Sequence, residues 1–302
     1  MQGISDVPEQ QIVTFIFILL IYLCALGGNT AILLLVYMSP NLHTPMYIFL
    51  CNLAVLDMSC STVTQCNLLT MFVTRNKKIS FYSCMSQIYL FSSFTSNELF
   101  ILTAMSYDRY MAICQPLHYV KVMNPKTCSL LFLVCWMLGF LAIIPYSVLL
   151  LQITCYKSNV INHFFCDIAP VMELSCSKTF ALEVLIFTEG IFLLSLTPFV
   201  LTLISYVFII GTIVRIPTSS GRRKAFYTCS SHLTVVTLLY GTLFFQYLRP
   251  ASSDTLKSNK LFSLFNTAMV PALNPVIYSL KNNDVKLAFK GMLTSFNTKI
   301  LT

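Results

Sequence analysis

The chain contains no Asp, Glu, Lys or Arg between Gln10 and Leu56. An uncharged stretch of this length exceeds one membrane crossing, because a helix rises 1.5 Å per residue and about 20 apolar residues span a bilayer. Pro40 and Pro45 interrupt the stretch and predict two helices. Over the whole chain 56% of residues are hydrophobic and only 10% are charged, a balance that excludes a single soluble globule. We therefore expect a helical membrane protein.

Similar apolar stretches continue along the chain, and they are too long and uniform to be the alternating strands of a β-barrel. Seven spans are expected, near residues 11–37, 45–74, 79–113, 127–151, 184–214, 225–248 and 261–280. A short amphipathic helix follows at 282–293, where Val285, Ala288, Phe289 and Met292 share one face. We expect this helix to lie flat on the inner leaflet, against membrane lipids. The predicted fold class is an all-α membrane protein, a seven-transmembrane helix bundle in one domain over residues 1–302.

The basic residues indicate which end of the bundle faces the cytosol. With the N-terminus outside, eleven Lys and Arg residues fall on the cytosolic side, and Arg222, Arg223 and Lys224 form a cluster there. Eight fall on the outer side, where six carboxylates offset them. The positive-inside rule therefore favours an outer N-terminus, and the net charge of +8 reflects membrane topology. No basic stripe interleaved with aromatic residues predicts nucleic acid as a partner.

Four polar residues stand inside four different apolar spans, where contact with lipid would be costly. They are Asn29, Asp57, Glu98 and Asn274. We expect them to converge in the interior of the bundle. A purely structural hydrogen-bonded cluster is one interpretation of these four residues.

A charge pair, Asp108 and Arg109, stands where the third span leaves the membrane, and Glu98 is the other charge in that span. Charges at a helix end can reach water, so a plain interfacial anchor is one interpretation. A short segment with Pro116 and then another apolar span follow the pair. This layout is typical of a receptor that offers Arg109 to a cytosolic partner.

Five sequence strings occur in order over nearly the whole chain. They are LHTPMYIFLCNLAVLD at 42–57, MSYDRYMAICQPLHY at 105–119, Ser205-Tyr206, KAFYTCSSHL at 224–233 and PALNPVIYSLKN at 271–282. Together with the seven spans, they resemble the olfactory receptor family of rhodopsin-like G-protein-coupled receptors. The resemblance implies a plasma-membrane receptor, in sensory cilia, that binds small volatile odorants in the outer half of the bundle. It also implies two kinds of protein partner, a stimulatory olfactory-type heterotrimeric G protein that raises cyclic AMP and export chaperones.

The resemblance assigns roles to residues at the cytosolic side. Coupling and switching would belong to Asp108, Arg109, Tyr110, Tyr206, Lys224 and Tyr278. Tyr278, together with Tyr206, would swing in on activation, and a static kink at Pro275 is the alternative. Asn29, Asp57, Glu98 and Asn274 would form a hydrated polar network that links the ligand pocket to the cytosolic face. Within it a switch role is favoured for Asp57 and Glu98, whereas a purely structural role explains Asn29 equally well.

Many receptors of this kind hold the Asp-Arg-Tyr arginine with an acidic residue on the sixth helix. This chain has no Asp or Glu between Arg215 and Leu248. We therefore expect the resting state to depend on Asp108 and on packing around Tyr206 and Tyr278. The basic cluster is expected to serve the G protein or anionic lipid headgroups.

Four of the twelve cysteines lie on the outer side, where disulfides form, namely Cys84, Cys155, Cys166 and Cys176. Four cysteines allow three pairings, and the sequence alone does not choose between them. The resemblance implies the pairs Cys84–Cys166 and Cys155–Cys176. His163 and Asp167 flank Cys166 and could hold a transition metal, but an oxidised cysteine is no ligand. Neither a metal nor a cofactor is expected.

The ligand site is predicted from helical spacing and from family position. On the third span the residues form an apolar stripe with hydroxyl groups, for which plain helix packing is the alternative. Amine receptors of the superfamily carry an aspartate where Phe91 stands, so an amine ligand is disfavoured. A mainly apolar cavity suits small volatile molecules. The predicted lining is Phe91, Ser92, Thr95, Ser96, Gly190, Leu194, Tyr240, Leu243, Phe244, Tyr247, Leu264 and Thr267, and Glu189 either joins it or extends outward.

Two other functions use similar spans. A receptor for small molecules outside olfaction would share every motif above. A secondary transporter also has carboxylates inside the membrane, but seven spans do not divide into equal inverted repeats. An enzyme is not expected, because no pairing of nucleophile with base and no set of metal ligands is visible in the sequence.

Overall fold

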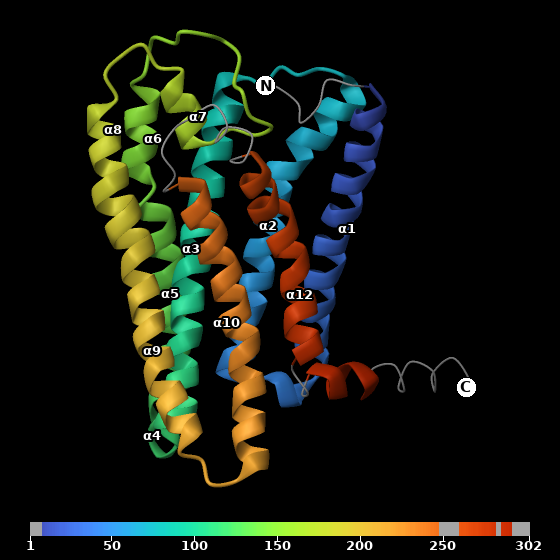
Figure 1. Ribbon diagram of the computed structural model, residues 1–302, viewed down its shortest axis with the longest axis vertical. Coiled ribbons are helices and arrows are strands. Elements are labelled where there is room, and N and C mark those ends of the chain that lie inside the picture. The colour runs from blue at the N-terminus through green and yellow to red at the C-terminus, as the bar shows by residue number, and fades with distance from the viewer. Residues whose placement is uncertain (1–7, 248–259, 282–284, 292–302) are drawn as a thin grey trace.

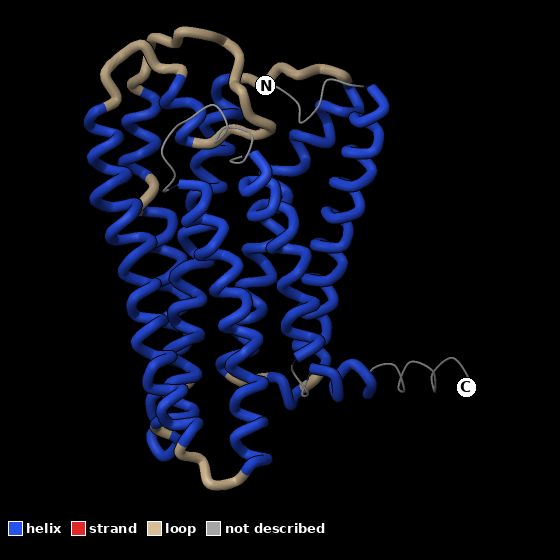
Figure 2. The backbone as a smooth tube through the Cα atoms, in the orientation of Figure 1, coloured by secondary structure: helices blue, strands red, loops and turns tan. Residues whose placement is uncertain are grey.

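The computed structural model describes residues 8–247, 260–281 and 285–291. Nearly all of this part is helical, and the long helices run side by side along the longest axis of the molecule (Figure 1, Figure 2). The β-structure found in it is a single bridge between Tyr156 and Ser175. The predicted fold class, a seven-transmembrane helix bundle, is confirmed.

Seven helical passes make up the bundle. They are α1 (Pro8–Met38), α2 (Pro45–Thr74), α3 (Phe81–Cys114), α5 with α6 (Pro125–Leu141 and Ile144–Leu151), α8 with η2 and α9 (Phe180–Leu185, Ile186–Leu196 and Thr197–Val214), α10 (Ser219–Tyr247), and a last pass that begins at Lys260 and contains η3 (Phe265–Met269) and α12 (Val270–Lys281). Six passes meet a length and hydropathy criterion for membrane crossing. The other is α3, which has 34 residues and a more polar middle. Short helices η1 (Pro40–Leu42), α4 (Pro116–Val122) and α7 (Ile168–Glu173) lie in the connections.

The helix ends follow from local sequence. The Ser80 hydroxyl caps α3 by accepting a hydrogen bond from the Ser83 amide at 3.1 Å. At α5 the Asn124 side chain caps the Thr127 amide at 2.9 Å, and Pro125 occupies the first turn, where a missing N–H costs nothing. Pro145 explains why the fourth pass is broken between α5 and α6, because its ring cannot continue an α-helix.

The sixth pass begins earlier than residue 225, the start predicted from hydropathy. The helix α10 starts at Ser219, so the basic cluster lies on its first turns. Arginine and lysine favour helices but lower hydropathy, so an apolar pattern cannot locate this end. The fifth pass likewise starts at Phe180 rather than at 184. Residue 248, the last of the predicted sixth span, lies outside the described residues.

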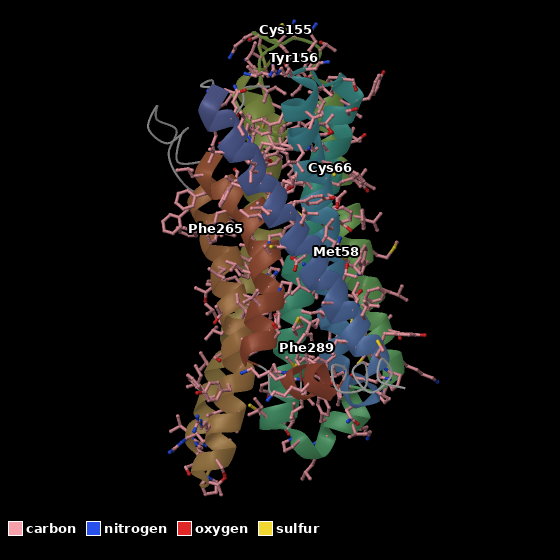
Figure 3. All side chains as sticks on the ribbon, turned by 90° about the vertical axis from the view of Figure 1, so that its right-hand side faces the viewer. Met58, Cys66, Cys155, Tyr156, Phe265 and Phe289 are labelled. Carbon is pink, nitrogen blue, oxygen red and sulfur yellow. A yellow bond between two sulfur atoms is a disulfide. The ribbon has the colours of Figure 1, made fainter. Side chains whose placement is uncertain are left out.

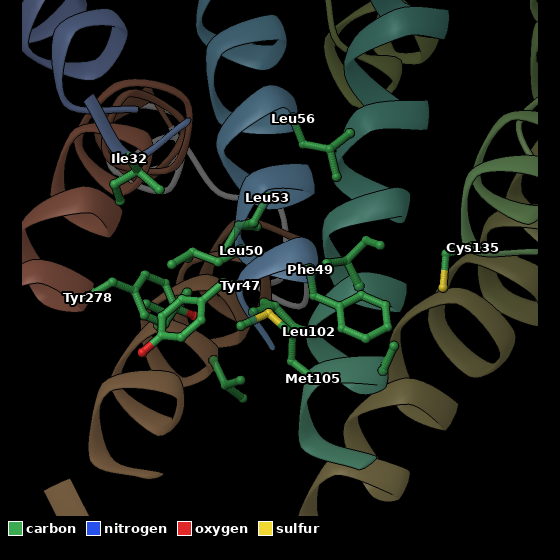
Figure 4. Packing of buried hydrophobic residues seen from close by; sticks show 14 of the residues in the cluster. Ile32, Tyr47, Phe49, Leu50, Leu53, Leu56, Leu102, Met105, Cys135 and Tyr278 are labelled. Atoms are coloured by element: carbon green, nitrogen blue, oxygen red, sulfur yellow. The ribbon is translucent and has the colours of Figure 1, made fainter. Parts of the chain in front are cut away.

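Helix α3 runs through the middle of the bundle and contacts α2, α5 and α9. The largest apolar cluster lies at the inner half, where Tyr47, Leu50, Leu102 and Met105 of α2 and α3 gather around Tyr278 of α12 (Figure 4). Side chains on the outside of the bundle are also apolar, and Leu20, Leu130 and Phe208 are all more than half exposed. In a membrane these side chains contact hydrocarbon.

A helix at 285–291 follows α12 in the chain and lies across the bundle axis (Figure 1). Val285 is buried, whereas Leu287 and Phe289 are exposed. Figure 3 shows Phe289 towards the end of the bundle opposite Cys155 and Tyr156. Met292 and the remainder of the predicted helix 282–293 lie outside the described residues, and its contact with the inner leaflet stays a prediction.

A close approach of α3 and α5 predicts a marked effect of one methyl group. A Cβ atom at Gly139 would overlap the Asn97 amide, which is held by a 2.8 Å hydrogen bond to the Ser93 carbonyl. Overpacking typically costs about 1–3 kcal/mol. We expect Gly139→Ala to lower the melting temperature in detergent micelles. The matched variant Gly27→Ala, which meets no atom within 4 Å, should not lower it, and an equal loss would disprove the close-packing explanation.

Candidate functional site

A cavity of about 1320 Å³ lies between α3, α6, η2, α9 and α10. Its outer mouth is lined by exposed loop residues such as Lys157 and Lys178, and its inner end reaches Tyr206 and Leu233. The cavity therefore extends from the outer loops to the half of the bundle that carries Arg109. The cavity therefore contacts both the predicted ligand residues and Tyr206, which the sequence assigned to coupling.

Nine of the twelve predicted ligand residues line this cavity. They are Phe91, Ser92, Thr95, Ser96, Gly190, Leu194, Tyr240, Leu243 and Phe244. The lining residues that carry charge are Lys157, Glu173, Lys178 and Glu183. All four belong to the outer loops or the first turn of α8. The deeper part of the described lining is apolar, with hydroxyl groups from α3 and α10, and such a surface suits a small uncharged molecule.

Several residues of the fourth and fifth passes line the cavity although they were not predicted from the sequence, including Tyr146, Ile186, Ile191 and Phe199. The segment η2 is a π-helix, whose hydrogen bonds join residues five apart. A π-helix places different side chains on one face than an α-helix does. Assigning lining residues by 3.6 residues per turn therefore fails in η2. The Tyr146 hydroxyl donates a 3.1 Å hydrogen bond to the Leu185 carbonyl and lies 3.3 Å from where a Cβ of Gly190 would be. Glu189 does not line the cavity.

Leu264 and Thr267, the two predicted ligand residues of the last pass, do not line the cavity. Phe164 and Phe165 are at most 1% exposed and pack in one cluster with Phe91 and Leu264. Thr267 is fully buried, and its hydroxyl donates to the Ser263 carbonyl. Leu264 and Thr267 therefore do not line this cavity, and their contact with a ligand stays a prediction. The side chain of Tyr247, also predicted for the lining, lies outside what the structure describes.

The same loop is held by covalent and polar contacts. Disulfides join Cys84 to Cys166 and Cys155 to Cys176, the pairs that the resemblance implies. The Cys166 amide donates a 2.9 Å hydrogen bond to Gln87 Oε1 on α3. No sequence motif predicted this contact. Burial, with a smaller effect of the Lys260 ammonium, lowers the pKa of His163 to about 4. The ring is therefore neutral at pH 7 and packs as an aromatic group against Phe164 and Phe165.

At the C-terminal end of α3, Arg109 forms an ion pair with Asp108. The Arg109 Nε atom lies 3.0 Å from Asp108 Oδ2, and Tyr119 on α4 donates a 2.9 Å hydrogen bond to Asp108 Oδ1. Burial, and then the Asp108 charge, raise the pKa of Tyr119, so its hydroxyl keeps the proton that it donates. Asp108 is fully buried and the Arg109 side chain is 13% exposed. Tyr110 is half-buried and its ring contacts Phe208 of α9.

His232 joins three helices at the inner end of the cavity, although the sequence predicted no role for it. His232 of α10 shares a 2.7 Å hydrogen bond with the hydroxyl of Tyr206 on α9. Its Nε2 lies 3.0 Å from the Leu102 carbonyl of α3, and because a carbonyl only accepts, Nε2 carries the proton. In the neutral ring Nδ1 then accepts the Tyr206 proton. The sequence signal that could have identified His232 is its polar ring inside the apolar sixth span.

Tyr278 is completely buried in the inner cluster, and its hydroxyl has no hydrogen-bond partner among the described residues. Tyr206 is also buried, so both tyrosines already lie in the interior in this structure. The prediction that they swing in on activation stays a prediction. The side chain of Lys224 lies outside what the structure describes.

The polar residues of the spans form two separate groups. Asn274 donates to both carboxylate oxygens of Asp57, at 3.0 and 2.9 Å. Glu98 is buried within electrostatic range of Asp57, but its Oε1 has no hydrogen-bond partner in the described part of the chain. Asn29 instead donates to the Pro271 carbonyl at 3.0 Å. That carbonyl is the one that Pro275, four residues later, cannot bond, so Asn29 replaces the missing backbone hydrogen bond.

Comparison with known proteins agrees with this architecture. The sequence profile of the family described as olfactory receptor matches residues 18–295. Olfactory receptor 6C3 from Homo sapiens is 46% identical over 291 residues, which cover 96% of this chain and 93% of the relative. Olfactory receptor 5AR1 from Mus musculus is 45% identical over 291 residues, which cover 96% of this chain and 94% of the relative.

Proposed function

The chain belongs to the olfactory receptor family, and we propose that it is an odorant receptor whose ligand binds in the cavity between α3, η2 and α10. The family is not enzymatic, and the protein is a multi-pass plasma membrane protein. The proposed ligand is a small, uncharged, volatile organic molecule. The proposed output is activation of a stimulatory olfactory-type G protein and a rise in cyclic AMP, in sensory cilia and with the N-terminus outside the cell.

One observation carries the proposal. The cavity is apolar and uncharged in its deeper part, yet it touches Tyr206, whose hydroxyl is bonded to His232. A ligand in the cavity can therefore alter the contact that joins α9 to α10 and, through the Leu102 carbonyl, to α3. The outer orientation of the N-terminus is supported by the basic cluster, which starts α10 at the same end of the bundle as α4 (Figure 1).

The proposed activation follows from these contacts. In the described conformation α10 offers no carboxylate to Arg109, and Asp108 takes that place. Ligand binding would weaken the Tyr206–His232 bond, let α10 move away from α3, and free Arg109 for the G protein. A ligand can shift this equilibrium only by the difference between its affinities for the two conformations. The shape of the cavity must therefore differ between the two conformations. It does so because α10 contributes lining residues such as Val236 and Tyr240, which move with the helix.

Filling the cavity tests the site. Agonists are first identified with a cyclic AMP reporter in cells that carry an olfactory-type stimulatory G protein and are tested with a broad odorant panel. Leu194 is 6% exposed and lines the cavity, whereas its neighbour Leu193 is 56% exposed and faces lipid. We expect Leu194→Trp to raise the half-maximal agonist concentration at least about tenfold, which equals about 1.4 kcal/mol. Leu193→Trp should leave it unchanged, and equal effects of the two variants at equal surface expression would refute this binding site.

Breaking the contact at the inner end of the cavity should release α10 without ligand. His232→Phe keeps an aromatic ring but removes both hydrogen bonds, so we expect a several-fold rise in basal cyclic AMP. Tyr206→Phe removes the shared bond and should act in the same direction, and the double variant should add little, because the two residues form one contact. The control His118→Phe changes an exposed histidine of α4. Unchanged basal signalling in both first variants would contradict the proposed role.

A further inference from the structure

A second hollow lies on the outside of the bundle, where the cytosolic ends of α9 and α10 meet. It has a volume of about 530 Å³ and is lined by Ile210, Ile213, Val214, Ser219, Arg222, Arg223 and Phe226. Its described lining shares no residue with the ligand cavity. A pocket of about 360 Å³ continues it along the same two helices and shares Ile210, Ile213 and Phe226 with it. The two form one groove, which we call the α9–α10 groove. Its upper part, the 360 Å³ pocket, shares Tyr206, Leu233 and Thr237 with the ligand cavity, whereas the part beside Arg222 and Arg223 shares none.

The walls of the α9–α10 groove face the membrane. Ile210 is 54% exposed, Val214 65% and Phe226 62%. In a helix bundle that crosses a bilayer, apolar side chains with this exposure contact lipid chains rather than water. The described lining residues of the 360 Å³ pocket, which extends along α10 to Leu238, carry no charge. An acyl chain is therefore the natural filling of this part.

The lower end of the groove is positively charged. Arg222 and Arg223 are both exposed there, and no acidic residue occurs between Arg215 and Leu248 to neutralise them. The Arg223 guanidinium lies over the Tyr227 ring, 5.5 Å from its centroid, a contact that orients the side chain. Guanidinium groups bind phosphate oxygens in pairs of hydrogen bonds, and basic residues at the inner membrane surface attract anionic lipids.

We propose that the α9–α10 groove binds one anionic phospholipid of the inner leaflet. Arg222 and Arg223 bind its phosphate-bearing headgroup, and one acyl chain lies against Ile210, Val214 and Phe226. The proposal commits to a lipid rather than a protein partner because the groove opens on the outer, lipid-facing surface of the bundle. It does not depend on the odorant or on the coupling mechanism proposed above.

The single tryptophan of the chain, Trp136, allows a direct test. In a Trp136→Phe background, Phe226→Trp places one fluorophore in the groove. The protein is reconstituted in phosphatidylcholine nanodiscs that contain a minor fraction of either brominated phosphatidylserine or brominated phosphatidylcholine, which quench nearby tryptophan. We expect the anionic quencher to be preferred roughly tenfold at equal mole fraction. In Arg222→Gln/Arg223→Gln this preference should disappear.

Two controls separate a defined site from general surface attraction. Leu130→Trp in the same background places the fluorophore on the lipid-facing side of α5, near its cytosolic end, where Leu130 is 61% exposed. We expect no comparable preference there. Lys121→Gln/Lys126→Gln should leave the preference at position 226 intact. The proposal is overturned by equal quenching with both lipids at position 226, by a preference that survives the arginine substitutions, or by an equal preference at position 130. Monomeric elution of each variant verifies folding.

Discussion

Arg109→Ala is expected to reach the cell surface and to give no cyclic AMP response to agonist. In the structure Arg109 is held by Asp108, which Tyr119 fixes from α4. The pair lies at the C-terminal end of α3, which we propose is the cytosolic end, so the guanidinium is the positive group that an opened α3–α10 contact would present to a G protein. Removing it leaves the ligand cavity intact, because no part of Arg109 lines it.

The measurement is agonist-driven cyclic AMP at matched surface expression. Arg75→Ala is the control, since it is the same substitution on an exposed residue between α2 and α3 at the opposite end of the bundle. Its response should equal that of the wild type. A normal response from Arg109→Ala would exclude the proposed coupling role and leave the interfacial-anchor interpretation.

Cys84→Ser and Cys166→Ser are each expected to abolish signalling, and the double variant should be no worse than either. This disulfide closes a sequence separation of 82 residues and attaches the loop that carries Phe164 and Phe165 to α3. Losing a disulfide typically costs about 2–5 kcal/mol. Here the loss also releases the two rings that pack in one cluster with Phe91 of the cavity lining, so folding and ligand binding fail together.

Surface expression and ligand response are measured for both single variants and for the double variant. Cys24→Ser, which changes an exposed free cysteine of α1, should have no effect. If the two single variants gave partial losses that add in the double variant, the cysteines would act independently and the covalent link would not explain their effects.

Much of this protein is encoded in local sequence. Apolar runs set the seven passes, because crossing a bilayer requires about 20 apolar residues in one helix. The Asp108–Arg109 pair was also expected from the sequence. Of the four polar residues expected to converge, Asp57 and Asn274 form a contact, since buried polar groups must find partners, whereas Asn29 bonds elsewhere. The family itself was evident from five strings in order, and the comparisons support it over most of the chain.

Other features depend on contacts between segments far apart in sequence, which no local pattern contains. The outer loop packs in one cluster with Leu264, and the cavity lies towards η2 and α10 instead of the last pass. His232 gains its role from Tyr206 and from a carbonyl of α3, and Asn29 gains its own from a carbonyl freed by Pro275. Hydropathy reports which residues avoid water, so it identifies the helices. Which buried polar groups meet, and which space stays open between the helices, is decided only when the whole chain packs.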